Sequence, residues 1–426
     1  MKAGILGAGI SGLSMARLLK NDFDEVEVLE KNKFAGGIAR TKDVDGVPYH
    51  LVGGHCFNSK YPEVLDFVFN EVLPINEWRK IKRKSKIRFH QHEVDYPIEF
   101  AVKQIYSFDK DLALKIVADF LNASDDRQYA NLEEWFIKKF GKTLADEYFI
   151  PYNAKIWNNH PRQMSHSWVE DKLPIPNKYD FFDSLAGNAD DQMPHAEFYY
   201  PVSNNQNTFI DALAKGLKII FGYPVNDIRF DPAQKQWIIN NDRKYDLIIS
   251  TLPLKEIPFL LEDTPDAIKS AGEKLKYNKV SNTLWKTQLT DKTWTYIPAK
   301  ELLFHRYIHI GAYLNPLFPC SISEVIGEHS PEEMKKSGKN DPFLLEALDH
   351  HVSDYAYVVF DENYRKSTSI IKDYLHEKQF HTLGRFGEWQ YYNMDICIKK
   401  AMELREFLLS QEIAGQARND NNYLKS

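Results

Sequence analysis

A glycine-rich turn near the N-terminus is the feature that most constrains the fold of this chain. Residues 7–12 (GAGISG) have the spacing G-x-G-x-x-G, follow an apolar strand pattern at 2–6 and precede a helix pattern at 12–20. A second strand pattern at 25–30 completes a βαβ unit. The sequence therefore predicts an α/β class fold with a Rossmann-like dinucleotide-binding unit at its start.

Each residue of this unit has its own expected role. Gly7 permits the tight turn, Gly9 lets a pyrophosphate approach the backbone, and Gly12 lets the helix pack closely on the strand. The helix N-terminus, at Ser11, adds partial positive charge next to the phosphates. Glu30 ends the second strand, where a carboxylate accepts hydrogen bonds from a ribose 2′-hydroxyl. The unit by itself does not separate NAD from FAD.

Length and composition narrow the remaining possibilities. A chain of 426 residues exceeds what one hydrophobic core normally serves, so two or three structural units are expected. The net charge of -6 gives no reason to expect a nucleic-acid partner, and the basic run 79–86 (RKIKRKSK) predicts a strand with one solvated face. No stretch reaches the roughly 18 apolar residues of a membrane span. Three widely spaced cysteines fit neither a disulfide framework nor a metal site, and we expect a cytoplasmic protein.

Hydrophobic periodicity divides the rest of the chain. Helix patterns at 112–121 and 132–149, the latter with Asn131 as N-cap, predict a helical insertion. A helix at 209–217, a strand at 218–221, a hairpin at 226–240 and a buried strand at 245–250 are expected to rejoin the first sheet. Residues 278–330 alternate like an antiparallel sheet, and a last helix is expected at 395–409, before a disordered polar end at 419–426.

The segment after the second strand indicates which dinucleotide is bound. Glu30 and Lys31 lead into residues 35–40 (AGGIAR), which resemble the second glycine pair and arginine of the superfamily of FAD-dependent amine oxidases and UDP-galactopyranose mutases. The resemblance implies FAD, and the position of Arg40 after the glycine pair implies a pyrophosphate contact.

Five further segments resemble the UDP-galactopyranose mutase family in order and approximate spacing, over most of the chain up to about residue 410. Residues 53–58 (GGHCFN) look like the histidine loop that lies against the flavin in these mutases. The others are 95–98 (DYPI), 140–157 with Pro151, 304–313 and 384–395. The resemblance implies a Rossmann-like FAD-binding domain made of residues 1–90, 200–275 and 375–410, a mainly helical substrate or lid domain at 91–199, an antiparallel-sheet substrate domain at 276–374, and a polar tail at 411–426.

The family also implies roles for individual side chains. Arginine carries a planar donor fork, which suits a diphosphate at Arg306 and the flavin at Arg385. A helix that begins near Met394 would direct its positive end at the flavin's pyrimidine ring. Expected catalytic residues are His55, Arg306, Tyr313 and Tyr391. Expected substrate-binding residues are Tyr152, Trp157, Tyr199, Arg306, Tyr313 and Tyr391. Expected cofactor-binding residues are Gly7, Gly9, Ser11, Gly12, Glu30, Lys31, Gly37, Ile38, Arg40, Gly54, His55, Val225, Thr251, Leu252, Gly384, Arg385, Asn393, Met394 and Asp395.

The chemistry implied by the resemblance is isomerisation without net redox change. In mutases of this family N5 of reduced FAD attacks the anomeric carbon of UDP-galactose and expels UDP, and the opened sugar recloses as a furanose. The expectation is therefore a nucleotide-sugar mutase for cell-surface polysaccharide or lipopolysaccharide biosynthesis, reduced by NAD(P)H or a reductase, with a homodimer as a further expectation. Two alternatives stay open: an oxidoreductase of the amine oxidase or protoporphyrinogen oxidase type, and a non-catalytic flavoprotein that binds nucleotide sugars.

The chain departs from the family pattern at residues 196–205. The mutases place an arginine shortly before the proline of this segment and a glycine pair after it, whereas this chain has Tyr199 at the first position and Asn204 and Asn205 at the second. Asparagine tolerates the left-handed backbone that such a turn requires. A tyrosine supplies no positive charge, so Arg162, which follows Trp157, is the candidate for a second cation at the diphosphate.

Overall fold

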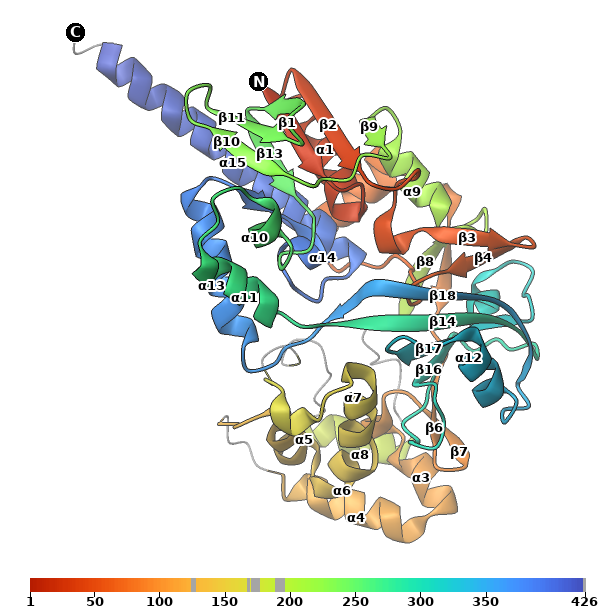
Figure 1. Ribbon diagram of the computed structural model, residues 1–426. Helices are drawn as coiled ribbons and strands as arrows, with labels where there is room; N and C mark the ends of the chain where they lie inside the picture. Colours follow the sequence, from red (N-terminus) through yellow and green to blue (C-terminus); the bar gives the residue numbers. More distant parts are fainter. Residues whose placement is uncertain (124–127, 167–168, 170–176, 188–195, 424–426) are drawn as a thin grey trace.

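A computed structural model describes residues 1–123, 128–166, 169, 177–187 and 196–423 (Figure 1). A five-stranded parallel sheet of order β19-β13-β1-β2-β9 forms the centre of its first part. Because all five strands are parallel, their carboxyl ends meet at one edge, where open α/β sheets bind ligands. The strands are β1 Lys2–Leu6, β2 Glu25–Glu30, β9 Lys218–Phe221, β13 Leu247–Ser250 and β19 His381–Thr382.

Helix α1 (Ile10–Leu19) follows β1 directly through the glycine turn. A Cβ atom at Gly12 would lie 2.0 Å from the carbonyl oxygen of Gly7, so only glycine permits this contact between helix and turn. On its other side α1 packs along α15 (Met394–Tyr423). The predicted βαβ unit and the α/β fold class are thereby confirmed.

A seven-stranded sheet of order β18-β14-β17-β16-β15-β6-β7 forms the second part. Neighbouring strands are antiparallel except β15 and β6, which run parallel. The antiparallel sheet expected at 278–330 is present, and β6 and β7 join it from much earlier in the chain. The strands are β6 Ser85–Phe89, β7 His92–Asp95, β14 Tyr277–Thr287, β15 Trp294–Tyr296, β16 Arg306–Ile308, β17 Cys320–Ile326 and β18 Leu344–Val358.

Three small sheets connect or flank these two. The expected hairpin is present as β10 with β11, and β12 extends it. The basic run forms β5 and the start of β6 with one solvated face, as predicted: Lys80, Lys82 and Lys84 are exposed. The side chains of Arg79 and Arg83, on the other face, turn inward to the carbonyl of Tyr313 and the hydroxyl of Tyr296. The strands are β3 Thr41–Val44, β4 Val47–His50, β5 Trp78–Lys82, β8 Glu197–Pro201, β10 Ile228–Asp231, β11 Gln236–Ile239 and β12 Arg243–Tyr245.

A helical unit lies below the seven-stranded sheet in Figure 1. The side chain of Asn131 accepts a hydrogen bond from the Glu134 N–H at 3.0 Å and caps α5, as predicted. The single helix expected at 132–149 is interrupted at Gly141, whose positive φ of 83° ends α5. The elements are α3 Val102–Phe108, α4 Lys110–Leu121, α5 Leu132–Phe140, α6 Lys142–Leu144, the π-helix η5 Ala145–Phe149, α7 Ile150–Trp157 and α8 Lys178–Ala186.

The remaining helices cover the five-stranded sheet and one end of the long strands. The expected disordered end is wrong up to Tyr423, because residues 404–418 are mainly Leu, Glu, Gln, Ala and Arg, which favour helix, and α15 continues through them. Residues 424–426 lie outside the described part. These helices are α2 Pro62–Asp66, α9 Asn207–Ala214, α10 Ile257–Leu260, α11 Asp266–Lys274, α12 Pro331–Gly338, α13 Tyr364–Glu377, α14 Gly384–Gly387 and α15. Within the described residues no helix is sufficiently long and apolar to cross a bilayer.

Candidate functional site

The glycine turn leaves an open cradle at the carboxyl edge of the five-stranded sheet. A Cβ atom built on Gly9 would meet no other atom within 4 Å, whereas one on Gly7 would meet Thr251 at 2.4 Å. The second glycine pair lies beside the turn: the N–H of Gly36 donates to the Ala8 carbonyl at 2.8 Å, and Gly37 packs on Gly9. The space in front of Gly9 is where a pyrophosphate would lie.

Glu30 holds this cradle at the end of β2. One carboxylate oxygen accepts the Ala8 N–H at 2.8 Å, and the other accepts the backbone N–H of Asn32 at 2.9 Å. The carboxylate is nearly buried and keeps lone pairs for a ribose hydroxyl. Val225 follows close by in the chain, where the Tyr223 N–H donates to the Glu30 carbonyl, whereas the side chain of Lys31 is exposed.

Arg40 is already engaged in the structure. Its guanidinium donates to the Asp211 carboxylate at 2.9 Å and to the Ala35 carbonyl at 3.1 Å. Its expected contact with a pyrophosphate therefore stays a prediction. Ile38 points the other way, toward Val52 in a small core beside the seven-stranded sheet.

Helices from the two ends of the chain meet beside the turn. A Cβ atom on Gly384 would lie 2.1 Å from the Ser11 hydroxyl, so α14 touches the first turn of α1. The long helix α15 begins here with Met394 and Asp395, and the Asn393 carbonyl accepts its first backbone bond. The sequence predicts these residues at the flavin, and in the structure both α14 and α15 contact α1, whose first turn carries Ser11.

The histidine loop lies between the two sheets and is sterically tight. A Cβ atom on Gly54 would come within 2.6 Å of Ile308 and 3.1 Å of the Tyr313 hydroxyl. Burial, and secondarily the positive charge of Arg385, lower the pKa of His55 to about 4, so its imidazole is neutral at physiological pH. Its Nε2 is buried and has no hydrogen-bond partner among the described residues.

His50 positions this loop, a role that the sequence patterns did not reveal. Its Nδ1 accepts the backbone N–H of His55 at 3.1 Å, and its Nε2 lies 2.9 Å from the hydroxyl of Tyr200. Burial lowers the pKa of His50 to about 3, so the ring stays neutral and donates through Nε2 to the tyrosine. No motif contains His50, and only its place at the end of β4, five residues before His55, could have drawn attention to it.

A cavity of about 210 Å³ opens between α7 and the seven-stranded sheet. It brings together four of the predicted substrate residues, Tyr152, Trp157, Arg306 and Tyr391. Aromatic rings form most of its wall, and Trp157 contacts Tyr391 with ring centroids 6.2 Å apart. Its remaining lining residues are Tyr96, Pro97, Glu99, Tyr148, Phe149, Asn153, Ile156, Tyr296, His305 and Tyr357.

Two predicted substrate residues do not line this cavity. Tyr313 is fully buried behind the wall, packed on Trp294, although its hydroxyl has no partner among the described residues. Tyr199 lies on β8 with its ring 4.9 Å from that of Phe69 and does not line the cavity, so its expected substrate contact stays a prediction. Alternation along β8 directs Tyr199 to the face opposite Tyr200, which packs against Tyr313.

Arg306 is held by a buried carboxylate that the sequence patterns did not indicate. Its Nε donates to Glu324 Oε1 at 2.7 Å and its Nη2 to the Tyr357 hydroxyl at 2.7 Å. His305 Nε2 lies 3.0 Å from the same carboxylate oxygen. Burial alone would raise the pKa of Glu324, but Arg306 and His305 lower it to about 2, so Glu324 is ionised and offsets the charge of Arg306.

Arg385 occupies the boundary between the cavity and the histidine loop. Its guanidinium carbon lies 4.5 Å from the ring centroid of Tyr391, and its Nη2 donates to the Ala356 carbonyl at 2.7 Å. Its Nε is buried without a partner among the described residues, like Nε2 of His55. Two unsatisfied polar atoms at this boundary leave hydrogen-bonding capacity for a ligand.

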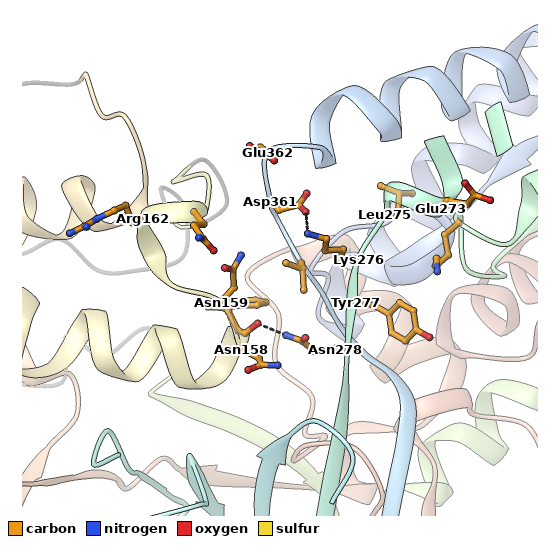
Figure 2. Close-up of a pocket in the computed structure, with 14 residues that line it drawn as sticks. Asn158, Asn159, Arg162, Glu273, Leu275, Lys276, Tyr277, Asn278, Asp361 and Glu362 are labelled. Atoms are coloured by element: carbon orange, nitrogen blue, oxygen red, sulfur yellow. Dashed lines mark hydrogen bonds and ion pairs between the residues drawn. The ribbon is translucent and has the colours of Figure 1, made fainter. Parts of the chain in front are cut away.

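A larger opening of about 790 Å³ adjoins Trp157 on the other side (Figure 2). Its walls are polar and mostly paired: Lys276 with Asp361 at 3.0 Å, and Asn278 with the Trp157 carbonyl at 2.7 Å. Arg162 lies here and not in the smaller cavity, and it makes two hydrogen bonds to Glu133. The expectation that Arg162 supplies a second cation to the Arg306 cavity is therefore not supported.

Comparison with known proteins gives the ancestry of this arrangement. Residues 5–70 match the family model of the NAD(P)-binding Rossmann-like domain. UDP-galactopyranose mutase from Mycoplasma genitalium is 26% identical over 94% of both chains, and that from Mycoplasma pneumoniae is 21% identical over 95% of both. The chain is thus similar to UDP-galactopyranose mutases over nearly its whole length. A dTDP-fucopyranose mutase from Escherichia coli is 27% identical, but the match spans only about half of that enzyme, 49%, and 43% of this chain.

Solved structures agree on the fold. A crystal structure of reduced UDP-galactopyranose mutase superposes with a TM-score of 0.82 at 22% identity, covering 96% of this chain and 94% of the other. A putrescine oxidase variant superposes with a TM-score of 0.63 at 14% identity, covering 96% and 99%. The fold of that mutase thus matches 96% of this chain, and the oxidase has a similar fold with a lower TM-score.

Proposed function

We propose that this protein binds FAD and, with the flavin reduced, isomerises a nucleotide sugar between its pyranose and furanose forms. The observation that carries the proposal is the junction of two sites: the cavity with Tyr152, Trp157 and Arg306 borders the loop of His55 through Tyr391 and Arg385. The similarity to mutases over nearly the whole chain supports the same reaction class.

The chain's own residues fit FAD. The open space at Gly9 suits the pyrophosphate, and the free lone pairs of Glu30 suit the ribose. The unpartnered Nε atom of Arg385 and Nε2 atom of His55 would face the ring system, near the start of α15. When bound and reduced, FAD supplies a nucleophilic ring nitrogen for the anomeric carbon.

The cavity residues then bind and orient the sugar nucleotide. Tyr152 and Tyr391 offer flat apolar faces to a base or sugar and hydroxyls to phosphate oxygens. Arg306 is fixed by Glu324 and Tyr357, so its donor fork is preorganised before a ligand arrives. The neutral His55 packs against the reacting region without adding positive charge. Trp157 closes one wall and excludes water.

Two substrates follow from the relatives: UDP-galactose, and dTDP-fucose because of the likeness of part of the chain to the Escherichia coli enzyme. We further propose a place in cell-surface polysaccharide biosynthesis in the cytoplasm, with NAD(P)H or a reductase as electron donor, and the discontinuous FAD domain, helical domain and antiparallel domain predicted from the sequence.

The deciding experiment gives UDP-galactopyranose or dTDP-fucopyranose to the dithionite-reduced protein and follows the furanose product by chromatography. Product should form only after reduction, and many product molecules should form per reducing equivalent. An oxidised protein of equal activity, or one product per reductant, would refute the mutase proposal.

The oxidoreductase alternative is favoured by the fold shared with putrescine oxidase and with a putative protoporphyrinogen oxidase, and steady hydrogen peroxide production during a substrate screen would support it. Binding of UDP without any isomerisation would support the non-catalytic alternative instead.

A further inference from the structure

An inward-pointing arginine of the basic run contacts two residues that line the proposed substrate cavity, and it lies outside the segments that resemble the mutase family. Arg83 lies between β5 and β6, with its guanidinium 4.7 Å from the ring centroid of Trp294 and 5.5 Å from that of Tyr96. It donates to the Tyr296 hydroxyl at 2.6 Å and to the Ser85 hydroxyl at 2.8 Å. These partners are all neutral, and no carboxylate pairs with Arg83 in the described part of the chain.

The sheet places this arginine next to Arg306. Strand β15 lies between β16 and β6, and Tyr296 pairs with Arg306 on one side and with Ile87 on the other. Tyr296 and Tyr96, which both contact Arg83, also line the cavity with Arg306. The side chain of Arg83 is partly buried and lies against these two rings of the cavity wall, although Arg83 itself does not line the cavity.

Charge balance separates the two arginines. Arg306 faces the cavity with its charge already offset by the ionised Glu324 at 2.5 Å. A nucleotide sugar carries two negative charges on its diphosphate, which one compensated guanidinium balances poorly. Arg83 has only hydroxyls and aromatic faces around it, and these offset part of its desolvation cost without cancelling its charge. A guanidinium without a countercharge is suited to bind an anionic ligand.

We propose that Arg83 is a substrate-binding residue that supplies the positive charge for the diphosphate in the Arg306 cavity. This inference rests on the proposed function and names the residue that takes over the role that the sequence had assigned to Tyr199 or Arg162. The guanidinium would exchange its hydrogen bond to Tyr296 for one to a phosphate oxygen, with the ring of Trp294 keeping it in place.

The test compares UDP and uridine binding to the FAD-loaded protein by isothermal titration. Arg83→Gln should weaken UDP binding by about 10- to 150-fold, the range of one lost charge-assisted hydrogen bond, and leave uridine binding unchanged. Lys84→Gln is the matched control. It removes one positive charge at the neighbouring position, where Lys84 forms a surface ion pair with Asp291. It should change UDP affinity little.

Further readouts make the outcomes distinct. The UDP affinity of the wild type should fall with salt more steeply than that of Arg83→Gln, because the variant lacks the screened charge. Arg83→Lys keeps the charge and should bind UDP with intermediate affinity, which preserves the test if Arg83→Gln fails to retain flavin.

Equal losses for UDP and uridine, or full UDP affinity in Arg83→Gln, would overturn the inference and leave the proposed function standing. A wild-type protein that binds neither UDP nor dTDP would overturn both.

Discussion

Replacing Glu324 by glutamine should make the protein less stable and yet bind UDP more tightly. The carboxylate is 0% exposed and the Arg306 side chain 18% exposed, at a separation of 2.5 Å. Glutamine keeps the shape but leaves a mostly buried guanidinium without its countercharge. Breaking a buried ion pair from one side costs about 3–5 kcal/mol, against about 0–1 kcal/mol for a surface pair. The released charge of Arg306 would at the same time attract a diphosphate.

Denaturant unfolding of the FAD-loaded protein measures the first effect and titration with UDP at low salt the second. Glu328→Gln, which breaks an exposed pair with Lys279, is the control and should cost less than about 1 kcal/mol. The double variant Glu324→Gln with Arg306→Gln should be more stable than Glu324→Gln alone, because no unpaired charge stays buried. A single variant as stable as wild type, or one with weaker UDP binding at full flavin content, would refute this account of the pair.

The ionised Glu324 also predicts that the unfolding free energy falls in acid. Its pKa of about 2 in the folded chain lies below the ordinary value of 4.5, so its stabilisation is complete above pH 4.5 and is lost as the pH falls toward 2. Glu324→Gln should flatten the decline in unfolding free energy across that interval. An unchanged decline would show that Glu324 is not held ionised by Arg306 and His305.

Three further predictions concern the cofactor and the core. Gly9→Val should fold normally but purify without flavin, because the valine side chain fits into the open space at Gly9 and there occupies the position of the pyrophosphate. Stoichiometric FAD in the variant would contradict this. Arg385→Ala should lower FAD content or shift the flavin potential, as read by absorbance and redox titration, and an unaltered flavin would exclude contact. Burial lowers the pKa of His309 to about 3, so the folded protein keeps this imidazole neutral and loses stability as the pH falls below the ordinary pKa of 6.5. His309→Asn should therefore reduce the slope of the unfolding free energy against pH between pH 6 and 4 by about 1.4 kcal/mol per pH unit. An unchanged slope would disprove this account of His309.

The parts of the fold that local pattern determines were predictable. The βαβ unit depends on glycine spacing and on periodicity within thirty residues, and the N-cap at Asn131 depends on one side chain. The entry of β6 and β7 into the second sheet was not predictable, because a parallel pairing with β15 joins residues about two hundred positions apart. The helix at 132–149 was overextended because periodicity alone gave too little weight to Gly141.

At the candidate site, the family resemblance located the residues that lie within its motifs. It missed residues whose role depends on the side chains that contact them in the folded chain. Arg306 was found through its motif, but its countercharge Glu324 lies in a fully buried strand, β17, and has no local signature. Tyr199 was expected at the substrate but does not line the cavity, because the order of segments does not show to which face strand alternation turns a side chain. Arg83 was overlooked because an alternating basic run usually indicates a surface strand.

The order of the sheets has a consequence for dissecting this protein. The chain leaves the five-stranded sheet after β2, enters the seven-stranded sheet at β6, returns at β9, leaves again for β14 and returns at β19. No contiguous fragment therefore contains one sheet whole without strands of the other, and a truncation from either end first removes strands of the five-stranded sheet. Limited proteolysis or fragment expression should accordingly yield the intact chain or insoluble pieces, and gene fusion is best confined to the termini. An insertion into this chain should be tolerated only in the loops between strands, because there it leaves the register of both sheets unchanged.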